Sequence, residues 1–223
     1  MFYRQAGTFR TSYAEDARFI PFREDRVMLA VILICAYLVI PFTASDYWLS
    51  GILVPWLALS CVAMGQNILM GYAGQHSLGS AGFMAVGAFA CWNLIHRIDG
   101  MPFLVAILLA GVIAALVGIV FGLPSLRVRG IYLAVATLAA QFFIVWVIDK
   151  FGWFKDYDSS GIITAQDMVI FGHNFESPAE KYLVVLGVVT ALTWVASNMA
   201  RGSVGRNWMA VRDMDVAAEV MGL

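Results

Sequence analysis

The sequence predicts an all-α polytopic membrane protein with about six transmembrane helices. Hydrophobic residues make up 61% of its 223 residues and charged residues only 13%, whereas soluble domains carry roughly 25% charged residues. Fifty consecutive residues, 47–96, contain no Asp, Glu, Lys or Arg. Because one bilayer crossing takes about 20 apolar residues, this run is long enough for two spans. The chain is therefore expected to cross the membrane several times.

Six apolar segments have lengths that suit single bilayer crossings. Pro41 closes the first segment, and Trp48 follows it as an aromatic anchor at the interface. Pro102 opens the fourth segment and Pro124 follows it, as expected of a residue that does not continue a helix. The predicted spans are 27–42, 49–70, 77–95, 102–123, 131–148 and 182–200.

Residues 71–82, GYAGQHSLGSAG, join the second and third predicted spans. Their four glycines make a poor helix interior, because each costs roughly 1 kcal/mol relative to alanine. Irregular backbone at membrane depth is tolerated only where it is buried in protein or lines a wet cavity. The stretch is therefore the candidate route for a solute, and a tight loop outside the membrane or simple close packing of two helices are the alternatives. Polar side chains in and before it are Gln66, Asn67, Gln75, His76, Ser77 and Ser80.

Charges outside the spans predict the orientation of the chain. Residues 1–26 carry five arginines, and five more lie at positions 127, 129, 201, 206 and 212. With the N-terminus in the cytoplasm, alternating crossings place ten of the fourteen Lys and Arg residues inside, as the positive-inside rule requires. The predicted organisation is a cytoplasmic segment 1–26, a transmembrane domain 27–200 and a cytoplasmic segment 201–223. The acidic connection 149–181 then lies outside.

The composition argues against several classes of protein. A net charge of −1 offers no basic face for nucleic acid. The three cysteines and three histidines show no metal-ligand spacing, so no metal site is expected. No predicted span carries an ionised residue of the kind that proton-coupled carriers use. The chain also lacks a GxxxxGK(S/T) phosphate loop, so we expect no cofactor in this chain and ATP bound only by partner subunits.

Two motif blocks within the spans resemble signatures of the permease subunits of branched-chain amino acid ABC importers. The first is the run 65–79, GQNILMGYAGQHSLG, and it is followed by Ala81, Phe83, Gly87 and Ala88. The second is the run 124–139, PSLRVRGIYLAVATLA, in which an arginine pair precedes a helix with Tyr132 and Thr137. His76 in the first block and Ser80 directly after it depart from the family pattern, so the resemblance does not carry the family's local substrate contacts over to this chain.

A third block, the run 203–222, resembles the cytoplasmic loop with which these permeases dock on their ATPase. Its sequence is SVGRNWMAVRDMDVAAEVMG. Apolar residues at spacings of 3, 4 and 3 predict one seam on a short helix, although an amphipathic tail would show the same periodicity. The residues of this seam are Val211, Met214, Ala218 and Met221.

The resemblance implies a permease subunit in the bacterial cytoplasmic (inner) membrane. Its implied partners are a second permease subunit, two ATP-binding cassette subunits and an extracytoplasmic substrate-binding protein. The implied residues of the substrate pathway are Asn67, Gly71, Gly74, Gln75, Ser77 and Gly79. The implied residues of the ATPase-docking segment are Gly205, Arg206, Val211, Arg212, Ala217, Ala218, Glu219 and Gly222. Family members continue for several helices beyond this block, so the chain is expected to be truncated, and residues 158–161 leave the outer gate unassigned.

Other functions remain open at this stage. Related permeases carry urea or short amides, and the sequence does not select among these substrates. A different class would be an intramembrane serine hydrolase using Ser77 next to His76, although adjacent residues seldom give a nucleophile and base the geometry they need. A third would be an ATP-independent channel. We expect no enzymatic activity from this chain, which carries no ATP-binding motif of its own.

Overall fold

A computed structural model describes residues 12, 23–98, 100–125, 130–157, 163, 168–170, 173–220 and 222 of the chain. Within these residues the fold is helical apart from connections and one two-stranded sheet, so the predicted all-α class is confirmed. Most of the predicted segment 1–26, the arginine pair at 127 and 129, and residues 158–161 lie outside the described residues. The elements are α2 (Arg23–Ile34), η1 (Cys35–Val39), α3 (Ile40–Thr43), η2 (Tyr47–Leu53), α4 (Val54–Asn67), η3 (Ile68–Tyr72), α5 (Ser80–Arg97), α6 (Phe103–Ser125), α7 (Ile131–Lys150), η4 (Gly152–Lys155), β1 (Met168–Ile170), β2 (His173–Phe175), α8 (Pro178–Arg201), α9 (Ser203–Asp213) and α10 (Asp215–Val220).

The first two long helical segments, Glu24–Thr43 and Tyr47–Tyr72, each contain a proline. Pro41 follows the π-helical turn η1, and Pro55 follows the π-helical turn η2. A proline ring clashes with the carbonyl group four residues earlier in an α-helix, and the wider π turn makes room for it there. Each of these helical segments therefore continues through its proline rather than ending at it.

In the part of the chain that the structure describes, five helices are long and apolar enough to cross a membrane, and they match five of the six predicted spans. The remaining prediction, 77–95, corresponds to α5, which has 18 residues and is not among the five. Its last turns carry Asn93, His96 and Arg97, and because the helix has only 18 residues these polar side chains count fully against its mean hydropathy. The prediction of a multi-pass membrane protein is confirmed. The five helices are Glu24–Thr43, Tyr47–Tyr72, Phe103–Leu123, Ile131–Lys150 and Pro178–Arg201.

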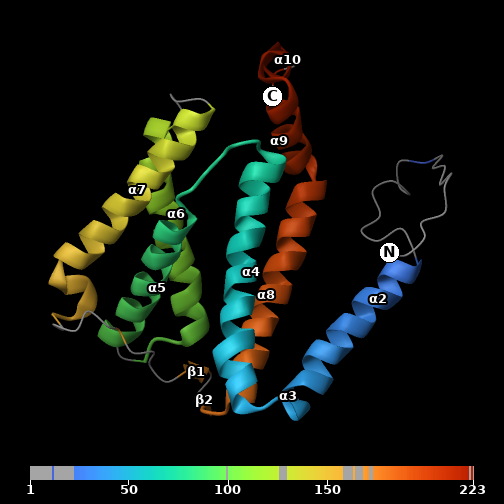
Figure 1. Ribbon diagram of the computed structural model, residues 1–223, viewed down its shortest axis with the longest axis vertical. Coiled ribbons are helices and arrows are strands. Elements are labelled where there is room, and N and C mark those ends of the chain that lie inside the picture. The colour runs from blue at the N-terminus through green and yellow to red at the C-terminus, as the bar shows by residue number, and fades with distance from the viewer. Residues whose placement is uncertain are drawn as a thin grey trace.

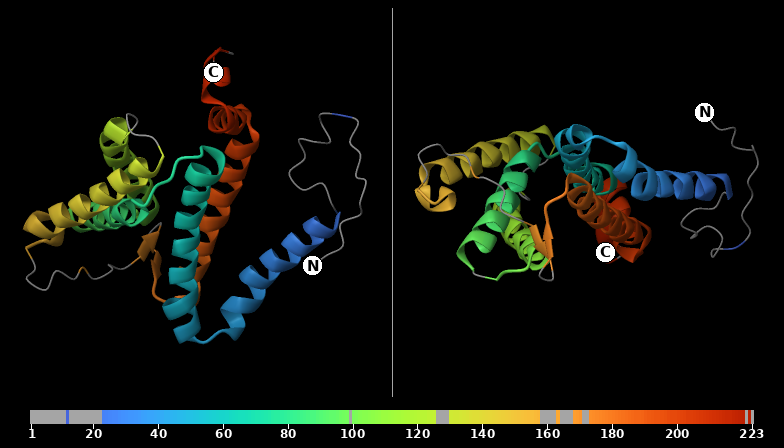
Figure 2. Two further views of the ribbon diagram at one scale, coloured as in Figure 1. Left: turned by 45° about the horizontal axis from the view of Figure 1, so that its top comes forward. Right: turned by 90° about the horizontal axis from the view of Figure 1, so that it is seen from below.

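The helices form two groups that lie side by side (Figures 1 and 2). One group pairs α4 with α8 and includes α3, while α2 leans away from it. The other group contains α5, α6 and α7. Residues 73–79 connect the groups at one end of the molecule, and the segment between α7 and α8 connects them at the other end.

The first group has a buried apolar core between α4 and α8. Its buried members come from η2, α4 and α8: Leu49, Leu57, Tyr182, Leu186 and Val189. Two hydrogen bonds then tie η1 to α8, since the Tyr37 hydroxyl lies 2.8 Å from Thr190 Oγ1 and the Tyr182 hydroxyl donates to Ala36 O at 3.2 Å. These bonds let polar side chains lie inside an apolar layer without unsatisfied groups.

Successive crossings put the connections at alternate ends of the molecule (Figure 1). The end of η3, the end of α6 and the helices α9 and α10 lie at one end. The end of α5, the β1–β2 hairpin and the turn between α3 and η2 lie at the other. The hairpin is antiparallel, pairs Met168 with Phe175, and falls in the connection 149–181, where the sequence predicted only a polar loop. The arrangement is the one that the predicted orientation requires, and the orientation itself stays a prediction.

Candidate functional site

The glycine-rich connection leaves helical geometry at Gly74 and then crosses between the two helix groups (Figure 1). Gly74 has a φ of +69°, a left-handed conformation that glycine adopts without steric cost. The N–H of Gln75 reaches back to Leu69 O at 3.0 Å, which satisfies a carbonyl group at the end of η3. Residues 74–79 are non-helical, so the predicted break between the second and third helices is present.

The far end of the connection packs tightly against α7. The N–H of Leu78 donates to Thr137 Oγ1 at 2.9 Å. A Cβ atom at Gly79 would lie 3.0 Å from the carbonyl oxygen of Thr137, and one at Gly82 would lie 3.0 Å from Gln141 Cα. The two glycines therefore allow the start of α5 to approach the backbone of α7 closely, as small residues do in membrane helix packing.

Ser77 is held in the middle of the connection by groups from both sides. The Gln66 side-chain amide donates to Ser77 O, and the N–H of Gly79 donates to Ser77 Oγ at 3.3 Å. The residue is 6% exposed. Buried polar groups are costly unless they have partners, and these bonds supply partners for both oxygens of Ser77.

A cavity of about 570 Å³ lies beside the connection, and we call it the polar cavity. Its polar lining comes from Gln75, His76 and Ser77 of the connection and from Thr137 on α7. Leu69 of η3, Phe83 of α5 and residues of α6 and α7 complete its wall. Amide, imidazole and hydroxyl groups thus face a space whose size is that of a small-molecule site.

The predicted pathway residues separate into three places. Gln75 and Ser77 line the polar cavity, and Gly79 lies beside it against Thr137. Asn67 is not in the lining of this cavity, and its side-chain oxygen lies 2.6 Å from where a Gly71 Cβ would be. That Asn67 faces a solute pathway stays a prediction. Sequence reasoning named Thr137 within a motif but not as a site residue, and its hydroxyl in an otherwise apolar turn of α7 was the available signal.

Arg212 of α9 reaches the other end of the glycine-rich connection. Its Nη1 donates to Gly71 O at 2.5 Å. A Cβ atom at Gly74 would lie 2.4 Å from Arg212 Cγ, so the arginine side chain occupies the space that Gly74 leaves open. Arg212 Nε also donates to Asp213 Oδ1 at 2.8 Å, and this hydrogen bond lowers the pKa of the Asp213 carboxyl. The residue predicted to dock an ATPase therefore contacts the connection that borders the cavity.

The prediction that the docking segment carries its seam on one helix is wrong. The chain breaks at Met214, whose φ and ψ of −152° and 91° separate α9 from α10. The predicted seam is therefore divided: Val211 and Met214 are exposed, while Ala218 is buried. Met221 and the side chain of Ala217 lie outside the described residues. A run of apolar residues at helical spacing does not reveal a break between two of them.

Gly205 lies where the first turn of α9 closely approaches the end of α8. A glycine with positive φ would have explained a close turn, but Gly205 is helical and its φ is not among the positive ones. A Cβ atom there would lie 2.0 Å from the carbonyl oxygen of Ala200. Gly205 therefore lets the first turn of α9 rest on the last turn of α8.

The comparisons with known proteins identify the family. The model of the family described as the branched-chain amino acid transport system permease component matches residues 48–223. The chain belongs to this family. Two curated relatives are the high-affinity branched-chain amino acid transport system permease proteins LivM of Escherichia coli (strain K12) and Salmonella typhimurium (strain LT2). Each is 29% identical to this chain over 185 residues, which cover 73% of the chain and 43% of the relative.

The chain thus spans less than half the length of the curated relatives it matches. No solved structure matches it at a comparable level of significance. The resemblance of the three motif blocks to branched-chain amino acid permeases is confirmed at the level of the family. In this permease-family chain the blocks also meet in space, because Leu78 of the first contacts Thr137 of the second and Gly71 of the first contacts Arg212 of the third.

The geometry gives no support to a serine hydrolase. Among the described residues, Ser77 Oγ accepts a hydrogen bond from the Gly79 N–H and makes none with His76. Ser77 is buried while His76 is exposed, so the two side chains lie in different environments. A nucleophile and its base need to lie within hydrogen-bonding distance of each other. Ser77 instead orders the backbone of the connection.

We predict that Gly74→Ala destabilises the protein more than Gly100→Ala. Both glycines have positive φ, +69° and +76°, so both variants carry the left-handed strain of roughly 1–2 kcal/mol. A Cβ at Gly100 meets open space, whereas one at Gly74 overlaps Arg212 Cγ and adds about 1–3 kcal/mol of overpacking. Thermal unfolding of the purified protein in detergent would measure the difference. Adding Arg212→Ala to Gly74→Ala should recover part of it, and equal losses in the two single variants would contradict the contact.

We also predict that Thr137→Val loosens the connection while Thr137→Ser does not. Valine keeps the volume of threonine but leaves the Leu78 N–H without its acceptor, at a cost of about 0.5–1.5 kcal/mol, the net worth of a typical hydrogen bond. Serine retains the hydroxyl that accepts this bond. Hydrogen exchange of the peptide around Leu78 should be faster in Thr137→Val and close to the parent rate in Thr137→Ser. Unchanged exchange in both variants would show that this bond does not hold the connection.

Proposed function

We propose that the chain acts as a transmembrane permease subunit of an ATP-driven importer for branched-chain or related amino acids. The observation that carries this proposal is the glycine-rich connection, which borders the polar cavity through Gln75 and Ser77 and contacts α9 through Gly71 and Gly74. Family membership supports the transport role. One element thus links the cavity that would pass a solute to the segment that would meet an ATPase.

The lining of the polar cavity suits a small zwitterion with an apolar side chain. Its polar groups are the neutral side chains of Gln75, Ser77 and Thr137 together with the imidazole of His76. Fixed dipoles from side chains and non-helical backbone meet the charges of a zwitterion in membrane transporters. The apolar residues of α6 and α7 would face an aliphatic side chain. Urea or a short amide is the alternative substrate within the family, and it would leave this apolar wall unused.

The remaining parts of the proposed transporter are supplied by partners. These are a second permease subunit, two ATP-binding cassette subunits that bind the ATP, and an extracytoplasmic substrate-binding protein. The absence of a phosphate loop from the chain supports ATP binding by partners. The positive-inside distribution of arginines supports a cytoplasmic N-terminus and a cytoplasmic position for residues 201–223 at the bacterial inner membrane.

The test is uptake by the assembled transporter in proteoliposomes. Radiolabelled leucine should enter only with ATP and the binding protein present, and excess isoleucine should suppress uptake whereas excess urea should not. Suppression by urea would favour the amide permease, and leucine entry without ATP would favour a channel. Absence of ATP-dependent leucine uptake by a complete assembly would overturn the proposal.

We predict that Gly205→Ala weakens binding of the ATPase subunits. The added methyl group would overlap the Ala200 carbonyl, so α9 must tilt away from the end of α8. Gly187→Ala is the matched control, because it lies on α8 itself and its Cβ would meet nothing within 4 Å. Co-purification of the ATPase subunits, with the amount of chain in the membrane held constant, measures the effect. Equal co-purification of both variants would show that the contact of α9 with α8 is irrelevant to docking.

Glu219→Lys is predicted to uncouple the ATPase subunits. Glu219 is exposed on α10, where it can meet a polar group at the rim of a partner. Loss of a charge-assisted contact costs about 1.5–3 kcal/mol, or about ten- to a hundredfold in affinity. Membrane insertion should be unaffected because α10 lies outside every span. Normal substrate-stimulated ATP hydrolysis by this variant would place the docking surface elsewhere.

A further inference from the structure

A second cavity of about 580 Å³ lies in the same group of helices, nearer to η4. We call it the apolar cavity, because aliphatic and aromatic side chains form its wall apart from Asn93 and Arg97. These side chains come from α5 and the residue after it, α6, α7 and η4. The polar cavity lies at the opposite end of these helices, beside the glycine-rich connection. Two cavities of nearly equal size therefore follow one another within a single three-helix group.

The two cavities meet at a pair of aromatic rings. Phe121 of α6 and Phe143 of α7 line both cavities. Their ring centroids are 6.0 Å apart and their planes are inclined by 57°, a favourable tilted contact between aromatic rings. On α7 the polar cavity is lined by residues from Leu133 to Phe143 and the apolar cavity by residues from Phe143 to Ile148. The boundary between the two therefore falls at one level of the helix.

We infer that Phe121 and Phe143 form the constriction of a solute route that runs through both cavities. This inference rests on the proposed transport function. From Leu133 to Ile148 the lined part of α7 is about 22 Å long at 1.5 Å per residue, which is most of a hydrocarbon core of about 30 Å. A route of this length crosses most of the membrane, and the ring pair closes it.

The surroundings of the rings allow the constriction to open without movement of helices. Gly118 and Gly122 flank Phe121 on α6 and have no side chains, and a Cβ at Gly122 would meet nothing within 4 Å. Phe143 is 52% exposed. Rotamer changes of exposed side chains occur within picoseconds to nanoseconds. Rotation of the rings can therefore join the two cavities.

At the far end of the apolar cavity, Arg97 belongs to the lining and Asp156 lies next to Arg97, outside the lining. Arg97 Nη2 lies 3.8 Å from Asp156 Oδ1, so a cation and an anion stand together there. Arg97 also donates to Trp153 O at 2.7 Å, and Asn93 Nδ2 donates to Phe154 O at 3.0 Å, which fixes η4 at the end of α5. An amino acid could place its charged groups near Arg97 and Asp156 and its aliphatic side chain in the apolar cavity. The substrate class is thus a small zwitterion with an aliphatic side chain.

The experiment measures access of a membrane-impermeant methanethiosulfonate reagent to single cysteines in the assembled transporter. Ala140→Cys reports on the polar cavity and Val147→Cys on the apolar cavity, after replacement of the native cysteines by alanine. Reagent added on the η4 side should label Val147→Cys and leave Ala140→Cys largely unmodified. Phe121→Ala or Phe143→Ala should raise the labelling rate of Ala140→Cys from that side by tenfold or more.

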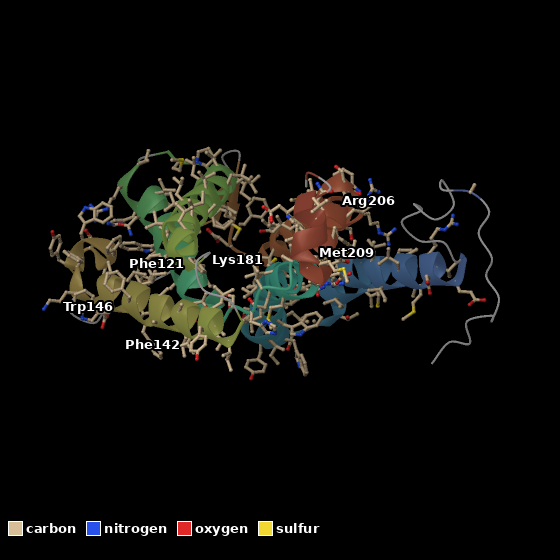
Figure 3. All side chains as sticks on the ribbon, turned by 90° about the horizontal axis from the view of Figure 1, so that it is seen from above. Phe121, Phe142, Trp146, Lys181, Arg206 and Met209 are labelled. Atoms are coloured by element: carbon tan, nitrogen blue, oxygen red, sulfur yellow. The ribbon has the colours of Figure 1, made fainter. Side chains whose placement is uncertain are left out.

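Phe142→Ala is the matched control. Phe142 is the neighbour of Phe143 on α7 but belongs to neither lining, and Figure 3 shows it on the outer side of the group that contains Phe121. It should leave the labelling of Ala140→Cys unchanged. Phe143→Trp keeps a large ring at the constriction and should preserve protection of Ala140→Cys. Labelling of Ala140→Cys that is equally fast with and without the ring pair, or that Phe142→Ala accelerates as much, would overturn the inference.

Labelling needs neither substrate nor ATP, so it separates this inference from the proposed function. A constriction revealed by labelling in a transporter that takes up no leucine would support the route and overturn the proposed substrate. Normal leucine uptake together with a labelling rate that ignores both rings would support the proposed function and overturn the constriction. In a transporter that works, Phe143→Trp should also slow leucine uptake more than Phe142→Trp does.

Discussion

The structure depends on how an irregular backbone is satisfied between two groups of apolar helices. Water cannot serve the peptide groups of residues 71–79 wherever these are buried, so protein groups must do so. The Gln75 N–H bonds back to η3, the Leu78 N–H to Thr137, and the Ser77 and Gly71 carbonyls accept from Gln66 and Arg212. These partners come from η3, α7, α4 and α9. The need to satisfy one short connection therefore brings four separate elements together.

Much of the fold follows from composition, but the way its helices pair does not. Long charge-free segments require helices, and four glycines in 71–82 require a break, so both were predictable from residues alone. The helices α6 and α7 are apolar on almost every side, and lipid is as apolar as their neighbours, so hydropathy does not say which face meets which helix. The separation into two groups, and the approach of Gly82 to Gln141, become visible only in three dimensions.

For the site, too, some residues were predictable from the sequence and others were not. Gln75 and Ser77 were predicted as site residues because polar groups at membrane depth are tolerated only where they are buried in protein or line a wet cavity. Both line the polar cavity. Thr137 lies 59 residues from Leu78, and no local sequence pattern predicts the hydrogen bond between them. Arg212 was predicted to face a partner on the basis of its motif. Its hydrogen bond to Gly71 depends instead on the position that α9 takes at the end of α8. The break at Met214 likewise follows from backbone conformation that apolar spacing does not encode.

In the proposed transport cycle, ATPase subunits outside these helices deliver the energy. Arg212 directly connects the proposed docking segment with the glycine-rich connection. It lies on α9, in the proposed docking segment, and its side chain fills the space beside Gly74 while its guanidinium holds Gly71 O. A displacement of α9 must therefore either break this bond or move the start of the connection. Since the connection also carries Gln75 and Ser77, the second outcome changes the wall of the polar cavity directly.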